Sequence, residues 1–238
     1  VFGDPRLQAQ VRELTAIDGT LLPALPRMAW ALWQNPQNRA GKLHLEFSVW
    51  RQVPTEFTVT SANTSERAVW QKKLKAGAFY VNDRGYSHDY GLIRVVQQKG
   101  ASFVLRLAHN AVLTPLAPAR ELTGADRRAG VVEDVPVRLG GGPAGPVGRL
   151  VRVEADGHTF LLFTDREDLA AELVALIYRY RWQVELFFKW VQCILGCRHW
   201  LAESLQGVTI QVYCALIASV LLVLWTGRKP TKRQWEAL

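Results

Sequence analysis

The sequence predicts a mixed α/β fold, and three observations support this class. The first half of the chain alternates short β-type runs with helical segments, the order expected of a mixed sheet flanked by helices. A stretch rich in proline and glycine follows, and it also contains β-type runs. Of the 238 residues, 49% are hydrophobic, so the chain is globular and can bury a sizeable core.

The predicted sheet begins near the start of the chain. Residues 14–17 are a short apolar run that ends at Asp18, which predicts a strand with an aspartate at its end. Residues 21–40 contain three prolines and are expected to form a loop. Apolar and polar residues alternate over 43–49 and again over 57–60, which predicts an antiparallel pair of strands.

Helices and buried strands are expected to alternate over the next segment. A capping-box pattern opens a predicted helix at 63–74. The continuous apolar run 78–81 predicts a strand that is buried on both faces, and it too ends close to an aspartate, Asp83. A helix is expected over 87–98 and a further buried strand over 103–105.

Residues 108–164 are expected to form a β-rich insert before the last helices. They contain five prolines, and β-type runs recur at 131–137, 149–153 and 159–163. Asp156-Gly157, between the last two runs, is a strong hairpin signal. We therefore expect a single domain over 1–238, with its α/β core at 11–107 and 165–225.

Two long helical segments close the predicted fold. A second capping-box pattern over 164–167 predicts the start of the first one. The apolar run 212–225 is short for a membrane span and is typical of a buried core helix. No membrane partner is expected.

Charge and cysteine content indicate the class of partner and the compartment. Lys and Arg number 29 against 21 Asp and Glu, a formal net charge of +8, and the isoelectric point is near 9.7. This balance favours a polyanionic partner, nucleic acid first, with a basic soluble enzyme as the alternative. Three cysteines are too few for a disulfide scaffold, so a reducing compartment is expected.

The most informative segment is the helical stretch around residues 178–192. On a helix, five polar side chains fall within an arc of roughly 80°. They are Tyr178, Arg181, Glu185, Lys189 and Gln192. A neighbouring stripe is apolar: Ile177, Val184, Phe188, Val191 and Leu195. A carboxylate among cations, a phenol and an amide suits a phosphate backbone and a metal ion, although a surface ladder of paired charges has the same spacing.

Three carboxylates are candidate metal ligands: Asp18, Asp83 and Glu185. Hard divalent cations bind such oxygen ligands. Two ions held by shared carboxylates can activate a nucleophile and stabilise the leaving oxygen of a phosphodiester. The alternative is that the two aspartates are ordinary turn residues after strands.

The local sequence around these residues resembles the DDE transposases of bacterial insertion sequences. The similar segments are "IDGT" around Asp18, "GKLHLEF" at 41–47, "NDRGY" around Asp83 and "YRYRWQVELFFKWVQ" around Glu185, in this order. The last segment is similar to the Tyr-x2-Arg-x3-Glu-x6-Lys signature of one subgroup. The resemblance covers about residues 11–225.

The resemblance implies a fold, a reaction and a set of site residues. The fold is a ribonuclease-H-like mixed sheet flanked by helices, with a β-rich insert before the catalytic glutamate. Asp18, Asp83 and Glu185 would be catalytic and would bind two Mg²⁺ or Mn²⁺ ions. The reaction is hydrolysis at the transposon end, followed by attack of the freed 3′-hydroxyl on target DNA, in several copies of the protein assembled on DNA.

The same resemblance assigns DNA contacts. Tyr178 and Arg181 would hold a transposon-end phosphate, and Lys189 is placed to join them. The final lysine of the signature is Gln192 here, and an amide carries no charge. Arg84, next to Asp83, is a further DNA-binding candidate, with packing at the turn as the alternative.

The insert contains no Trp and no Tyr, which counts against hairpin-forming chemistry. Two other departures from the family favour an alternative function. Few residues precede Asp18, so the DNA-binding region that relatives carry there is expected to be missing, and Gln192 replaces the final lysine of the signature. The alternative is a decayed or domesticated remnant that binds DNA without transposing. In either case we expect a protein of the bacterial cytoplasm, associated with the nucleoid.

Overall fold

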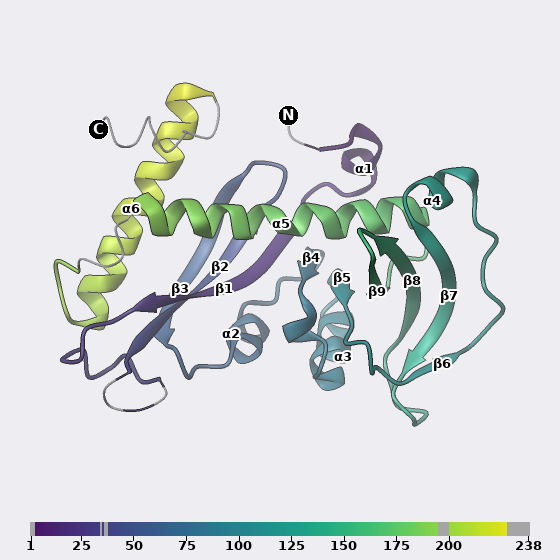
Figure 1. Cartoon of the computed structure of the whole chain (residues 1–238), viewed down its shortest axis with the longest axis horizontal. Helices are drawn as coiled ribbons and strands as arrows, with labels where there is room; N and C mark the ends of the chain where they lie inside the picture. The colour runs from purple at the N-terminus through teal and green to yellow at the C-terminus, as the bar shows by residue number, and fades with distance from the viewer. Residues whose placement is uncertain (1–2, 34, 36–37, 195–199, 228–238) are drawn as a thin grey trace. The chain divides into compact units, whose positions relative to one another are not determined.

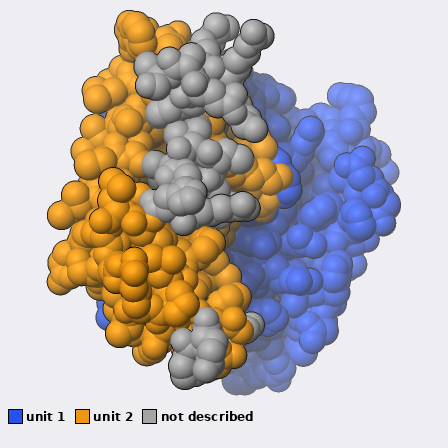
Figure 2. Space-filling view, turned by 60° about the vertical axis from the view of Figure 1, so that its left-hand side comes forward, with its two compact units in different colours: residues 1–16, 70–182 blue, residues 17–69, 183–238 orange. Residues whose placement is uncertain are grey.

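The computed structural model describes residues 3–33, 35, 38–194 and 200–227. The chain divides into two compact units, which Figure 2 colours separately. The first comprises residues 1–16 and 70–182, and the second comprises 17–69 and 183–238. Because the units alternate along the chain, β1 (Thr15–Pro23), α2 (Glu66–Lys73) and α5 (Ala171–Ile194) each begin in one unit and continue in the other.

Six strands of the first unit follow the order β4-β5-β9-β8-β7-β6 (Figure 1). Their bounds are β4 Phe79–Asn82, β5 Ser102–Arg106, β6 Leu113–Pro115, β7 Val131–Leu139, β8 Val147–Ala155 and β9 His158–Thr164. The first two strands are parallel, and every other neighbouring pair is antiparallel. The sheet is therefore mixed, as predicted, and β6 to β9 lie in the range expected to be β-rich.

Helices complete the first unit. They are α1 (Pro5–Gln10), α3 (Tyr90–Gln98), α4 (Gly124–Arg128), a single 3₁₀ turn at Arg84–Tyr86, and the first half of α5. Trp70, on α2, packs edge-on against Tyr80 and Tyr86, each at 5.4 Å between ring centroids. This aromatic cluster packs the 3₁₀ turn that follows Asp83 against β4 and α2.

The hairpin predicted at Asp156-Gly157 is confirmed. Ala155 pairs with His158, so the turn between β8 and β9 has two residues. Asp156 has φ 51° and Gly157 has φ 74°. Positive φ at both central residues defines a type I′ turn, whose twist matches that of the flanking strands. Asp-Gly is among the sequences that most often form this turn.

The second unit contains strands in the order β3-β2-β1. The predicted antiparallel pair is confirmed as β2 (Ala40–Ser48) and β3 (Val53–Ser61). Helix α6 (Leu205–Thr226) packs on β3, where the rings of Tyr213 and Phe57 are 4.3 Å apart. The second half of α5 packs on β2 through Phe187 and Phe47, whose ring centroids are 5.1 Å apart.

The prediction that Asp18 ends its strand is wrong. Asp18 lies inside β1, which continues to Pro23. Leu22 is 1% exposed, so packing extends the strand beyond the Asp-Gly pair. The predicted loop is shorter for the same reason, because β1 and β2 take residues from both of its ends.

Two predicted helix starts also differ from the structure. Thr164 ends β9 and donates to the carbonyl of Phe103, while the Asp165 carboxylate accepts from the amide of Phe103. Both groups therefore bind the neighbouring strand, and α5 begins later, at Ala171. The helix expected from residue 87 begins at Tyr90, because the Asp89 side chain caps it by accepting from the amide of Leu92.

Helix α6 is buried on one face only, although its sequence is typical of a fully buried helix. Its buried residues are Val208, Val212, Leu216 and Ser219. Leu224 is 74% exposed and Trp225 is 80% exposed. Among the described helices, α6 is long and apolar enough to cross a membrane, judged by length and composition alone.

Candidate functional site

Asp83 directly follows β4, as the sequence predicts. Its carboxylate makes no capping hydrogen bond to the 3₁₀ turn that it precedes. It accepts a hydrogen bond from the hydroxyl of Tyr178 instead, at 3.1 Å. The end of β4 and helix α5 therefore meet at this hydrogen bond. Asp83 remains partly exposed, so its carboxylate is accessible.

Tyr178 is 9% exposed, and its surroundings keep it protonated. Burial raises the pKa of the Tyr178 hydroxyl to about 12, and the negative charge of Asp83 acts in the same direction. The positive charges of Arg181 and Arg106 lower this pKa, but they do not outweigh burial. The phenol therefore keeps its proton at neutral pH and can donate to Asp83.

Two guanidinium groups and a phenylalanine ring surround this hydrogen bond. Arg181 is buried, with its guanidinium carbon 5.5 Å from the centre of the Tyr178 ring. The rings of Phe160 and Tyr178 are 6.0 Å apart, and Arg106 lies 4.8 Å over the Phe160 ring. A carboxylate, a phenol and two cations thus gather within the first unit.

Sequence reasoning did not select Arg106, although a usable signal existed. The strand predicted at 103–105 is buried, like the one at 78–81, and Arg106 directly follows it. In the structure the two strands are parallel, and Asn82 pairs with Leu105. Their polar ends therefore lie beside one another.

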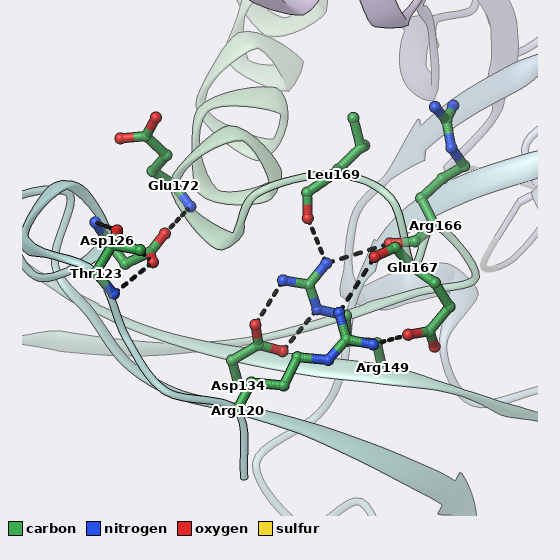
Figure 3. A network of polar contacts seen from close by, with 9 residues as sticks. All are labelled: Arg120, Thr123, Asp126, Asp134, Arg149, Arg166, Glu167, Leu169 and Glu172. Atoms are coloured by element: carbon green, nitrogen blue, oxygen red, sulfur yellow. Dashed lines mark hydrogen bonds and ion pairs between the residues drawn. The ribbon is translucent and has the colours of Figure 1, made fainter.

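The start of α5 is held by a polar network from residues 120–169 (Figure 3). Asp126, which forms a capping box with Thr123 on α4, accepts from the amide of Glu172 at 2.8 Å. This bond satisfies one of the amides that a helix start leaves unpaired. The pKa of Asp126 is lowered: burial raises it, but hydrogen bonds from Thr123 and Glu172 outweigh burial.

A buried ion pair supports the same segment. Nε of Arg149 is 2.6 Å from the Asp134 carboxylate, and both residues are almost completely buried. The same guanidinium donates to the carbonyls of Arg166 and Leu169, just before α5 begins (Figure 3). Asp134 on β7 and Arg149 on β8 therefore hold the segment just before α5, the helix that carries the polar stripe.

Asp18 and the remaining stripe residues belong to the second unit. Asp18 and Glu185 are both partly exposed, and the Asp18 carboxylate accepts from the amide of Gly19 at 2.8 Å. Lys189 is exposed. Gln192 lies in α5, but its side chain is outside the described residues, as is Leu195.

The helix prediction itself is confirmed. Helix α5 contains all five polar stripe positions, and four of the apolar stripe residues are buried. These four are Ile177, Val184, Phe188 and Val191. Exposure of the polar stripe increases along the helix, from buried Tyr178 and Arg181 to exposed Lys189.

The three predicted metal ligands do not form a cluster within one unit. Across residues 3–33, 35, 38–194 and 200–227, no group of three or more His, Cys, Asp or Glu side chains could hold an ion. Asp83 belongs to the first unit, whereas Asp18 and Glu185 belong to the second. Arg84 is exposed in the 3₁₀ turn.

The family assignment comes from comparison with known proteins. The family model of the transposase DDE domain matches residues 9–221. The chain belongs to this family. The DDE transposases of insertion sequences were the family predicted from the sequence, and that prediction is confirmed.

Curated relatives are transposases of bacteria. This DDE domain is 30% identical over 214 residues to the putative transposase y4zB of Sinorhizobium fredii, covering 88% of this chain and 60% of that one. It is 28% identical over 216 residues to a probable transposase for insertion sequence element IS5377 of Geobacillus stearothermophilus, covering 89% and 56%. The chain therefore spans about three-fifths of the length of these relatives.

A solved structure supports the fold. The DDE domain is similar to the piggyBac transposase, solved by cryo-electron microscopy as a synaptic complex with hairpin DNA. The TM-score is 0.53 at 11% sequence identity, covering 93% of this chain and 50% of that chain. At this identity the likeness concerns the fold alone, and it confirms the predicted ribonuclease-H-like class.

Proposed function

We propose that this chain is the catalytic domain of an insertion-sequence transposase, which hydrolyses DNA phosphodiesters at transposon ends and transfers the strands to target DNA. The observation that carries the proposal is the hydrogen bond between Tyr178 and Asp83. It joins the polar stripe of α5, which begins with the Tyr, Arg and Glu of the signature, to the aspartate of the "NDRGY" segment. The chain's membership of the transposase DDE family supports the same reaction.

In this proposal Asp18, Asp83 and Glu185 hold two Mg²⁺ or Mn²⁺ ions. The three side chains suit such ions, because each is a partly exposed carboxylate, the ligand that hard divalent cations prefer. When bound, the ions would activate the attacking oxygen and stabilise the leaving oxygen of the phosphodiester. Tyr178 orients the Asp83 carboxylate by donating to it.

The DNA backbone would be held by the cations and donors beside these carboxylates. Arg181 and Lys189 supply charge, and Gln192 and Arg84 supply further donors. Tyr178, whose one proton is donated to Asp83, lies beside them as part of the proposed DNA-binding surface. Contacts of this type position a phosphate without reading the base sequence. We further propose several copies of the protein on DNA in the bacterial nucleoid, and a division into core residues 11–107 and 165–225 with an insert at 108–164.

The function is tested with purified wild-type protein, precleaved transposon-end DNA and a target plasmid. We expect covalent joining of the two DNAs with Mg²⁺ or Mn²⁺, and none with EDTA. End DNA that terminates in a 3′-deoxynucleotide is the matched control, because it lacks the attacking hydroxyl. Metal-independent binding without any joining would favour the remnant that binds DNA but does not transpose.

Replacing Tyr178 with Phe is expected to slow joining by roughly 10- to 100-fold, because a hydrogen bond to a charged group contributes about 1.5–3 kcal/mol. The ring and its contact with Phe160 remain, so folding should be retained. Tyr90→Phe is the control, since the Tyr90 ring packs against Gly140. Equal joining rates for Tyr178→Phe and the wild type would contradict the role given to the hydroxyl.

A further inference from the structure

Arg106 lies at the same edge of the first unit's sheet as Asp83. It is the last residue of β5, and Asp83 directly follows β4. These strands are parallel, and Asn82 pairs with Leu105, so the next residues on the two strands are Asp83 and Arg106. An arginine therefore stands beside the carboxylate that accepts from Tyr178.

The Arg106 side chain is oriented by an aromatic ring. Its guanidinium carbon lies 4.8 Å over the ring of Phe160, which is itself next to Tyr178. Leu162 pairs with Arg106 across the antiparallel strands, and Phe160 is two residues before Leu162 in β9. Stacking of a guanidinium on a ring restrains its position without neutralising its charge.

Arg106 forms no direct ion pair in the described part of the chain, although it lies at the same sheet edge as Asp83. None of the ion pairs there includes Arg106, whereas Arg149, Arg152, Arg166 and Arg120 of the same unit each pair with a carboxylate. Arg106 is partly buried, so its guanidinium is restrained and still accessible. A restrained guanidinium of this kind is suited to bind an anionic group of a ligand.

We propose that Arg106 binds a phosphate oxygen of the DNA backbone beside Asp83, forming one phosphate-binding cluster with Arg181 around Tyr178. The planar guanidinium can donate two parallel hydrogen bonds to a phosphate, which gives both energy and orientation. Arg106 thereby extends the DNA contacts from α5 to the sheet edge. The inference rests on the proposed function, because it specifies a substrate contact for that site.

The salt dependence of DNA binding tests the proposal without requiring catalysis. The wild-type protein and its variants are titrated with end DNA in EDTA at several salt concentrations. Arg106→Gln is expected to lower the slope of log K against log salt by about one unit, the loss of one phosphate contact. Arg106→Lys keeps the charge and should keep the slope. Arg120→Gln, which removes a guanidinium paired with Glu167, is the control and should leave the slope unchanged.

The outcomes separate this inference from the proposed function. A wild-type protein that does not bind DNA overturns both. DNA binding with an Arg106→Gln slope equal to that of the wild type overturns the Arg106 contact alone. Equal losses in Arg106→Gln and Arg106→Lys also overturn it, because the effect would then not follow charge.

A second measurement uses only the wild-type chain and does not depend on the folding of a variant. Phenylglyoxal modifies accessible arginines, and mass spectrometry locates the modified positions. End DNA is expected to protect Arg106 by at least severalfold while leaving Arg120 and Arg152 modified as in free protein. Arg106 modified equally with and without DNA would refute the contact.

Discussion

Replacing Glu185 with Gln is expected to reduce strand joining by on the order of a thousandfold or more, while DNA binding remains. The substitution keeps the shape of the side chain but removes the negative charge that a divalent cation requires. Metal stabilisation of a phosphodiester reaction contributes several kcal/mol, and each 1.36 kcal/mol corresponds to about tenfold in rate. Joining is measured with precleaved end DNA and Mn²⁺, and binding is measured in EDTA.

Glu172→Gln provides the matched control on the same helix. Glu172 pairs with Arg6 at 2.8 Å near the start of α5, and the Arg6 side chain is largely exposed. A pair of this kind contributes little, about 0–1 kcal/mol, so joining should be close to that of the wild type. Asp83→Asn and Asp18→Asn should behave like Glu185→Gln. If Glu185→Gln retained a tenth or more of the wild-type rate, Glu185 would not be a metal ligand.

Replacing Arg149 with Met is expected to lower the free energy of unfolding by about 3–5 kcal/mol, because it leaves the buried Asp134 carboxylate without its cation. It also removes the donors to the carbonyls of Arg166 and Leu169, before the start of α5. The change is measured by urea denaturation monitored by circular dichroism. Combining it with Asp134→Leu should restore much of the loss, because no unpaired charge then remains buried.

Arg152→Met is the control for the ion pair. Arg152 lies on the same strand β8 and pairs with Glu133 at 2.8 Å, but both side chains are more than a third exposed. Its loss should cost less than about 1 kcal/mol, because water screens the pair. Equal destabilisation by Arg149→Met and Arg152→Met would show that the loss of stability does not depend on burial of the ion pair.

The sequence was most informative where one local period or one turn determines the structure. The stripe of α5 depends only on helical spacing, so Tyr178, Arg181, Glu185 and Lys189 could be placed on one helix in advance. The Asp-Gly hairpin was predictable for a similar reason, because two residues with positive φ define it.

Boundaries were less predictable because distant residues set them. Thr164 matches a helix cap, but its hydroxyl donates to the carbonyl of Phe103, far away in the chain. The first turn of α5 is capped instead by Asp126, which is 46 residues before Glu172. Asp18 continues its strand because of the buried Leu22.

For the candidate site, the sequence alone determined which residue types are available: a family-typical set of carboxylates, a stripe of phosphate-binding groups and a basic balance of charge. Only the tertiary structure decided that Tyr178 donates to Asp83 and that Arg106 and Phe160 stand beside them. The physical reason is strand pairing. The register of β4, β5 and β9 brings Asp83, Arg106 and Phe160 together, although 77 residues separate Asp83 from Phe160, and no local pattern encodes that register.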